Sequence, residues 1–173
     1  MTESNSPAPT GRDFWERTAK RYDASMLLFG GPLEEMKRRV VAAVKGRDRV
    51  LELAAGTGLV TEAIAPVVTR LVATDYSAAM VAELDARVRA QGLSNVETRT
   101  LDVYELEEES AFDAIVATNV LHLLPDVDAA IAAMVRALRP GGVLVVPTYC
   151  HDQTAPARLT SRILGWVGFP GQR

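Results

Sequence analysis

Residues 49–58 read Arg-Val-Leu-Glu-Leu-Ala-Ala-Gly-Thr-Gly, an apolar strand segment that runs directly into a loop with glycines at 56 and 58. Glycine lets the backbone turn sharply and pass close to a ligand, because no side chain stands in the way. The next apolar run ends at Asp75, seventeen residues after Gly58. An acid at the end of a second strand can accept hydrogen bonds from both hydroxyls of a ribose. The glycine loop and the acid together predict a site for a nucleoside cofactor.

Short apolar runs alternate with helical stretches along the chain, which is the pattern of a parallel sheet covered by helices on both faces. Two helices are expected first, from Arg12 to Phe29 and from Pro32 to about Val44. Ser77 is expected to cap a later helix, which Gly92 ends. Strands are expected at 49–53, 70–74, 96–100, 112–118 and 143–148, and helices at 59–66, 77–90 and 127–138. The predicted fold class is α/β with a doubly wound, mostly parallel sheet.

The composition is that of an ordinary globular protein, with 173 residues of which 48% are hydrophobic and 24% charged. We expect a disordered tail at residues 1–10 and a single domain at residues 11–173. The net charge of -3 argues against a dedicated nucleic-acid binder. The single Cys150 cannot form an internal disulfide, the amino terminus lacks signal-peptide features, and no apolar run reaches the roughly 20 residues needed to cross a bilayer. We therefore expect a cytoplasmic protein.

The residues around the glycine loop narrow the choice of cofactor. Glu52 lies four residues before Gly56, and Thr61 stands where a dinucleotide-binding fingerprint has its third glycine. This pattern resembles the ExxxGxG motif of class I S-adenosylmethionine-dependent methyltransferases. Residues 100–103 resemble the family's adenine-contacting segment, and residues 138–144 resemble its turn before the fifth strand. The resemblance covers about residues 14–148 and implies a Rossmann-like sheet, S-adenosyl-L-methionine as the cofactor, and methyltransferase activity.

The same resemblance assigns the cofactor-binding residues to the ends of the strands. It implies that the methionine end is met by Glu52, Ala54, Gly56, Gly58, Thr118 and Asn119, the ribose by Asp75, and the adenine by Tyr76, Met80, Asp102 and Val103. Ala54 departs from the family's usual glycine, and we expect reduced backbone freedom there without loss of the site. Simpler interpretations are a helix-capping acid for Asp75 and a solvated turn aspartate for Asp102. A buried carboxylate at Glu52 is expected to have an assigned partner, because an unpaired one is costly.

His122 follows the fourth expected strand and is a candidate catalytic residue. A histidine near the acceptor could take a proton as the acceptor attacks. The alternative is a packed or solvent-facing histidine at the start of a helix. Cys150 and His151 follow the fifth strand and could face the same cleft. Two histidines and one cysteine without ligand spacing predict no metal site.

The amino-terminal segment suggests a subfamily. Residues 14–15 and 19–23, which end in Tyr22-Asp23, resemble the first helix of a methyltransferase group often called type 11. That group includes the methyltransferases of ubiquinone and menaquinone biosynthesis and bacterial phospholipid N-methyltransferases. The resemblance implies that helices at about 12–44 form a lid and that Tyr22 closes over the cofactor. The alternative for Tyr22 is an ordinary core aromatic of an amphipathic helix.

Both ends of the chain bear on possible partners. Residues 12–29 and 158–169 combine basic with aromatic side chains, so they could make peripheral membrane contact or pack as lids over a small soluble substrate. After residue 148 no further strand can be placed, and the family's carboxyl-terminal antiparallel hairpin is therefore expected to be absent. An unprotected edge on the fifth strand would favour association with another chain, such as a homo-oligomer.

The sequence therefore predicts transfer of a methyl group from S-adenosylmethionine to a small or lipophilic acceptor. Two other hypotheses remain open. One is a non-catalytic cofactor-binding module that acts through a partner chain at the fifth strand. The other is an NAD-dependent oxidoreductase, which Gly56, Gly58 and Asp75 favour and Glu52 and Thr61 disfavour. The motifs do not identify the acceptor or its reacting atom.

Overall fold

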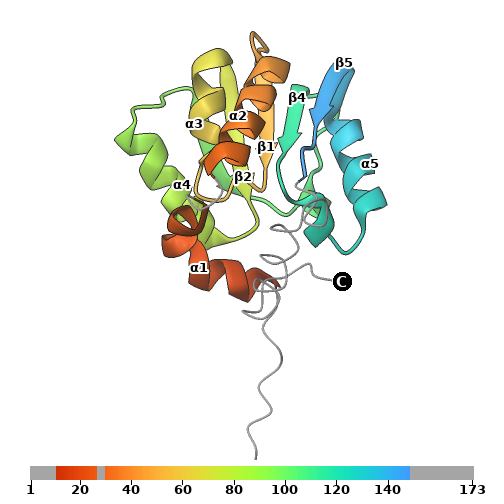
Figure 1. The fold of residues 1–173 in the computed structure, drawn as a ribbon. Helices are drawn as coiled ribbons and strands as arrows, with labels where there is room; N and C mark the ends of the chain where they lie inside the picture. Colours follow the sequence, from red (N-terminus) through yellow and green to blue (C-terminus); the bar gives the residue numbers. More distant parts are fainter. Residues whose placement is uncertain (1–10, 27–29, 149–173) are drawn as a thin grey trace, which may run out of the picture.

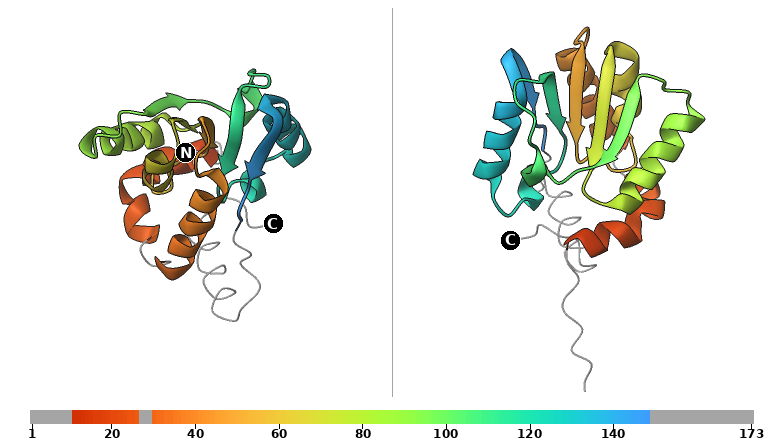
Figure 2. Two further views of the ribbon diagram at one scale, coloured as in Figure 1. Left: turned by 90° about the horizontal axis from the view of Figure 1, so that it is seen from above. Right: turned by 180° about the vertical axis from the view of Figure 1, so that it is seen from behind.

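A single parallel sheet organises the molecule. The computed structural model describes residues 11–26 and 30–148, in which the sheet lies between two layers of helices (Figures 1 and 2). Its five strands run in the order β3-β2-β1-β4-β5, and every adjacent pair is parallel. They are β1 (Arg49–Leu53), β2 (Arg70–Asp75), β3 (Val96–Thr100), β4 (Phe112–Ala117) and β5 (Leu138–Val145). The predicted α/β class with a mostly parallel sheet is confirmed.

Except for α3, the helices begin and end close to where the sequence pattern places them, as far as the structure describes them. They are α1 (Gly11–Met26), α2 (Gly30–Val44), α3 (Thr61–Ile64), α4 (Ala78–Ala90) and α5 (Val127–Ala137), with short 3-10 helices η2 (Ala65–Val67), η3 (Val103–Glu105) and η4 (Leu121–Leu123). The side chain of Ser77 accepts a hydrogen bond from the Met80 N–H at 3.3 Å, so it caps α4 as expected. Asp126 caps α5 in the same way, through the Ala129 N–H at 2.9 Å.

The core occupies both faces of the sheet because successive strand residues point to opposite sides. Val50 joins one apolar cluster and its neighbour Leu51 joins the other. The first cluster contains buried side chains of α2, α3 and α4, among them Val40, Val44, Ile64 and Leu84. The second contains Phe112, Ile115 and the α5 residues Ala130 and Met134. Apolar residues on both faces make this a doubly wound sheet with little solvent contact at its centre.

Helix α1 lies beyond the sheet, near the start of α4 (Figures 1 and 2). The Glu16 carboxylate of α1 accepts hydrogen bonds from the Ala78 and Ala79 N–H groups at 3.1 and 3.3 Å. These are two of the backbone donors that the first turn of a helix leaves unpaired, and a negative charge there is favoured by the helix dipole. Glu16 therefore attaches α1 to the end of the sheet at which the parallel strands finish.

Two expected elements differ from those observed. The last strand begins at Leu138 and ends at Val145, so its predicted range of 143–148 was wrong at both ends. Leu138 pairs with Phe112, and a register shift follows before Ala114, with Gly141 at a φ of +78°. The segment expected to be a turn is instead an irregularity within the strand, since Gly141 readily adopts that conformation.

The expected helix at 59–66 is also shorter than predicted. Only Thr61–Ile64 is α-helical, and the 3-10 turn Ala65–Val67 follows. Pro66 lies in that turn and has no N–H to continue the α-helical hydrogen bonds. Within 11–26 and 30–148, no helix is long and apolar enough to cross a membrane.

Two glycines with positive φ provide a test of packing at the glycine loop. A Cβ at Gly58 would lie 2.7 Å from Cδ1 of the buried Leu84, whereas a Cβ at Gly92 would meet nothing within 4 Å. Gly92→Ala should lower the free energy of unfolding by about 1 kcal/mol, because only backbone strain is added. Gly58→Ala should lower it by about 2–4 kcal/mol, because overpacking is added to that strain. Urea denaturation of both variants measures the difference, and equal losses would contradict this packing.

Candidate functional site

The parallel strands end at a cavity of about 610 Å³. Its walls come from the segments that follow β1, β2, β3 and β4 and from α1 and α2. Nine of the residues expected at the cofactor site line it: Ala54, Gly56, Asp75, Tyr76, Met80, Asp102, Val103, Thr118 and Asn119. A concave site of this size at the carboxyl edge of a parallel sheet is typical of small-molecule binding in this fold class.

The glycine loop has an unusual backbone conformation. Ala54, Gly56 and Gly58 have φ angles of +54°, +58° and +91°. The left-handed region costs a residue with a Cβ about 1–2 kcal/mol, so Ala54 adopts a conformation that glycine would take more easily. The surrounding contacts maintain it: the Ala55 N–H donates to the Thr74 carbonyl at 2.9 Å, across to the neighbouring strand. The loop therefore keeps its turn despite the alanine.

Asp75 holds this loop in place. One carboxylate oxygen accepts from the Gly56 N–H and the other from the Ser77 N–H, each at 2.9 Å. Burial raises the pKa of Asp75, and the two backbone donors oppose that rise by favouring the ionised form. The carboxylate lines the cavity while it joins the loop after β1 to the start of α4. The sequence predicts a ligand-binding role for Asp75 but does not predict its hydrogen bonds to the loop.

Glu52 lies beneath the loop and is fully buried. One of its oxygens accepts a hydrogen bond from the Thr61 hydroxyl at 2.7 Å, and the other, Oε1, has no hydrogen-bond partner among the described residues. Burial raises the pKa of Glu52 to about 8, with the Thr61 hydrogen bond opposing the rise and the Asp75 charge adding to it. Glu52 and Gly58 are not among the cavity-lining residues described. The expected partner of Glu52 is therefore Thr61. Glu52 and Thr61 support the loop on the side away from the cavity, since neither is a described lining residue.

The side of the cavity near β2 and β3 carries the charged and aromatic groups. The Arg12 guanidinium of α1 lies 5.1 Å from the Tyr76 ring centroid and 4.0 Å from the Asp102 carboxylate. Asp102 also accepts from the Tyr104 N–H at 3.1 Å. Burial, together with the adjacent Asp75 charge, raises the pKa of Tyr76 to about 12, so the phenol stays neutral at physiological pH.

The side near β4 is less polar. Thr118 and Asn119 line it, and the Asn119 N–H donates to the Pro147 carbonyl at 2.9 Å. Asn119 has a φ of +53°, a conformation that asparagine tolerates better than most residues. Leu123, Leu124 and Pro125 continue this wall.

Of the two candidate catalytic residues, only the side chain of His122 is described by the structure. His122 is exposed and is not among the cavity-lining residues, although Leu123 beside it is. Tyr22 belongs to α1, but its side chain lies outside what the structure describes, as do Cys150 and His151. The lining residues that sequence reasoning missed include Arg12, Trp15, Leu33 and Tyr104. Their only signal was membership of amphipathic or loop segments, which does not point to a ligand.

The chain is similar to known proteins in both sequence and fold. Residues 51–144 match a family model described as a methyltransferase domain. A phosphatidylethanolamine N-methyltransferase from Cereibacter sphaeroides is 31% identical over 158 residues, which cover 88% of this chain and 76% of that protein. The chain belongs to the class I methyltransferase family. A demethylmenaquinone methyltransferase from Thermobifida fusca is also 31% identical, over 90% of this chain and 68% of its own. The resemblance to phospholipid and menaquinone methyltransferases is confirmed.

Solved structures agree with membership of the methyltransferase family. A complex of DhpI with SAM and HEP is 26% identical, with a TM-score of 0.69 over 91% of this chain and 73% of that one. The [4+2]-cyclase SpnF is 25% identical, with a TM-score of 0.68 over 83% of this chain. The chain spans 61% of SpnF and 58% of another solved structure, YcgJ from Bacillus subtilis. This methyltransferase domain therefore corresponds to part of the length of those proteins.

The raised pKa of Glu52 predicts a pH-dependent stability. The folded pKa of about 8 exceeds the ordinary 4.5, so the folded state binds this proton more tightly than the unfolded chain. The contribution of protonated Glu52 to the free energy of unfolding is complete below pH 4.5. It is lost as the pH rises toward 8, by about 1.4 kcal/mol per pH unit. In Glu52→Gln this contribution is absent. Urea denaturation from pH 5 to 9 should show the variant gaining stability relative to the wild type as pH rises, and parallel curves would contradict the prediction.

The two backbone contacts of Asp75 predict a cost to folding as well as to binding. Asp75→Asn keeps one acceptor oxygen and places an NH₂ group against the other backbone N–H, which should lower the free energy of unfolding by about 1–3 kcal/mol. Asp102→Asn is the matched control, since the described backbone N–H that Asp102 accepts, from Tyr104, needs only one acceptor oxygen. Thermal and urea denaturation compare the two variants. Equal stability of Asp75→Asn and the wild type would exclude the organising role.

Proposed function

We propose that this protein transfers the methyl group of S-adenosylmethionine to a small or lipophilic acceptor. The observation that carries the proposal is one cavity that combines the Asp75 carboxylate, the turn at Gly56 and the Asp102 carboxylate at the ends of adjacent strands. The family to which the chain belongs and the SAM-bound DhpI structure support the same cofactor. Bound S-adenosylmethionine would supply a methyl group on a sulfonium centre: the acceptor's electron pair bonds to the methyl carbon, and the sulfur keeps the electrons of the broken bond as a thioether.

The residues of the cavity fit such a cofactor. Both Asp75 oxygens already accept a backbone N–H, and a carboxylate has about four lone-pair positions, so acceptor capacity remains for ribose hydroxyls. The Tyr76 ring and the Met80 side chain offer apolar surface to an adenine, and Asp102 offers an acceptor to its amino group. Ala54, Gly56 and Asn119 would surround the methionine end. The buried Glu52, beneath the loop, and the buried Gly58, within it, would act by shaping the loop.

The charge distribution supports an acceptor with apolar surroundings. Arg12, Asp75 and Asp102 are the charged side chains among the described lining residues, and they belong to α1 and to the segments that end β2 and follow β3. The wall beyond β4 has Leu123, Leu124 and Pro125 instead. Few catalytic side chains are required for this reaction, because alignment of an activated methyl group with its acceptor provides much of the rate enhancement. Two similar proteins are named for phosphatidylethanolamine and demethylmenaquinone, which supports a lipophilic acceptor for this chain.

Resemblance in fold alone does not determine the reaction. SpnF, which has a similar structure, is described as a [4+2]-cyclase. Cofactor binding and methyl transfer must therefore be measured separately. The NAD-dependent hypothesis is disfavoured by the methyltransferase family match.

Calorimetric titration tests the cofactor site. The wild-type chain should bind S-adenosylmethionine and S-adenosylhomocysteine and should not bind NAD. Asp102→Asn should weaken S-adenosylhomocysteine binding by about tenfold, since an amide NH₂ replaces an acceptor that carries charge. Glu105→Gln is the control, because Glu105 is an exposed acid three residues away and is not a described lining residue.

The outcomes separate binding from catalysis. A folded wild-type chain that binds neither S-adenosyl compound would contradict the proposal. If both bind, incubation with quinols, phospholipids and small amines tests methyl transfer. Mass spectrometry detects a methylated acceptor, whose mass rises by one CH₂ unit, about 14 Da. Binding without transfer to any acceptor class would favour the non-catalytic module.

A further inference from the structure

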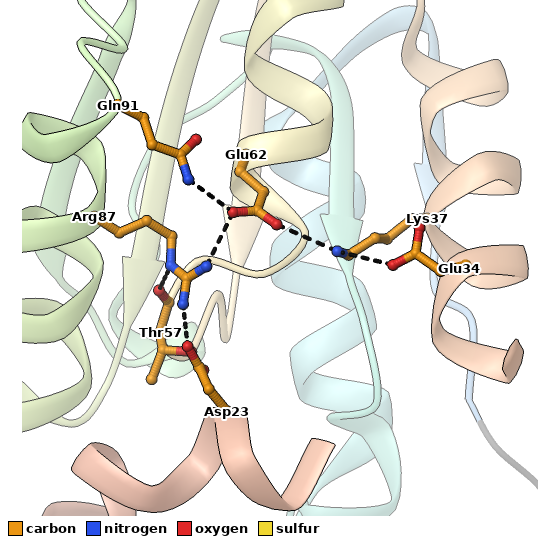
Figure 3. Close-up of polar contacts among 7 residues, drawn as sticks. All are labelled: Asp23, Glu34, Lys37, Thr57, Glu62, Arg87 and Gln91. Atoms are coloured by element: carbon orange, nitrogen blue, oxygen red, sulfur yellow. Dashed lines mark hydrogen bonds and ion pairs between the residues drawn. The ribbon is translucent and has the colours of Figure 1, made fainter. Parts of the chain in front are cut away.

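Arg87 of α4 connects the glycine loop to α1 without lining the cavity. Its side chain is 20% exposed and uses three nitrogens in three directions. Nε donates to the Thr57 carbonyl at 2.8 Å, one terminal nitrogen donates to Glu62 of α3 at 2.9 Å, and the other pairs with Asp23 of α1 (Figure 3). The planar guanidinium suits this role because its donors have a fixed geometry.

The contact with the loop is steric as well as polar. Thr57 lies between the two glycines of the loop, and its hydroxyl also donates to Asp23. A Cβ at Gly58 would lie 3.2 Å from Arg87 Cδ, so the arginine stem packs directly against the loop backbone. Arg87 of α4 thus holds the carbonyl of Thr57, and Asp23 of α1 holds its hydroxyl.

Arg87 belongs to a network of acidic and basic side chains. Glu62 accepts hydrogen bonds from Arg87 and Gln91 at 2.9 Å and from Lys37 of α2 at 3.3 Å (Figure 3). Burial alone would raise the pKa of Glu62, but these hydrogen bonds outweigh it and hold the pKa below its usual value. The carboxylates of Glu62 and Asp23 flank one guanidinium, and removal of that cation would leave both without their shared partner.

We propose that Arg87 is a positioning residue that fixes the glycine loop in its cofactor-receiving shape and couples that shape to the docking of α1. The inference rests on the proposed function, since it assumes that the loop receives S-adenosylmethionine. Arg12 and Trp15 of α1 line the cavity together with Gly56 of the loop, so a loop and a helix that are held by one residue contribute to the lining of one site. Cofactor binding should then stabilise α1, and loss of α1 docking should weaken cofactor binding, because coupling between two sites is reciprocal.

The test uses the full chain, with S-adenosylhomocysteine as the probe. Arg87→Gln should weaken its affinity by about tenfold or more, and Arg87→Lys should restore only part of it, because a lysine cannot reproduce the three-way contact. Arg89→Gln is the matched control: Arg89 lies on the same helix, is exposed and pairs with Asp85, and the affinity should be unchanged.

Hydrogen exchange of the α1 amides supplies a readout that does not depend on activity. Arg87→Gln should speed exchange in α1, both without ligand and with S-adenosylhomocysteine, whereas Arg89→Gln should not. Asp23→Asn removes the α1 side of the contact and should produce the same two effects to a smaller degree. In Arg87→Gln/Asp23→Asn the loss of affinity should be smaller than the product of the two single losses, since both variants break one connection.

Two results would overturn the inference. One is wild-type affinity together with wild-type α1 exchange in folded Arg87→Gln. The other, if Arg87→Gln does not fold, is full affinity and unchanged exchange in Asp23→Asn. Failure of the wild-type chain to bind S-adenosylhomocysteine would instead overturn the proposed function, and α1 exchange in the unliganded variants would still decide whether Arg87 couples the loop to the helix.

Discussion

The Asp75 carboxylate is the interaction on which the arrangement of the site depends. It accepts one hydrogen bond from the loop after β1 and one from the start of α4. The loop has positive φ angles at Ala54, Gly56 and Gly58, so local backbone preference does not maintain its shape. Because α4 in turn provides the N–H groups that hold Glu16, the position of α1 also depends on where Asp75 places the start of that helix.

Burial of two acids, Glu52 of β1 and Asp75 of β2, costs free energy, and the structure offsets this cost differently for each. Burial raises the pKa of both Glu52 and Asp75. Asp75 receives two backbone donors, whereas one oxygen of Glu52 accepts from Thr61 and the other has no hydrogen-bond partner among the described residues. Acids with perturbed pKa values gather at functional sites more often than elsewhere, which agrees with a site at this edge. The cations Arg87 and Lys37, which bind Glu62, are not among the described lining residues of the cavity. Arg87 instead contacts the loop at the Thr57 carbonyl.

Much of the fold could be predicted because its signals are local. The bounds of β1 and β3 agree with the predicted strands, since short apolar or β-branched runs were bounded by clear turn residues. The prediction for β5 was wrong because the pairing of Leu138 with Phe112 extends the strand through a Pro-Gly-Gly segment that reads locally as a turn. The cavity likewise contains most of the expected cofactor residues, since the ends of parallel strands meet at one edge. The catalytic role of His122 stays a prediction: its side chain is exposed and is not among the described lining residues, and chain position does not specify which side of a short helix faces the cavity.

The sequence by itself determined the order of strands and helices, the glycine loop, the acid that follows it and the methyltransferase family, because each is encoded in the type and spacing of neighbouring residues. Only the tertiary structure decided that Asp75 organises the loop, that Thr61 is the partner of Glu52, and that Arg87 joins Thr57 to Asp23. The last contact links residues 64 positions apart. A pairing of this kind leaves no periodicity in the chain, since it arises when separate helices pack around a common loop and bring their polar side chains together.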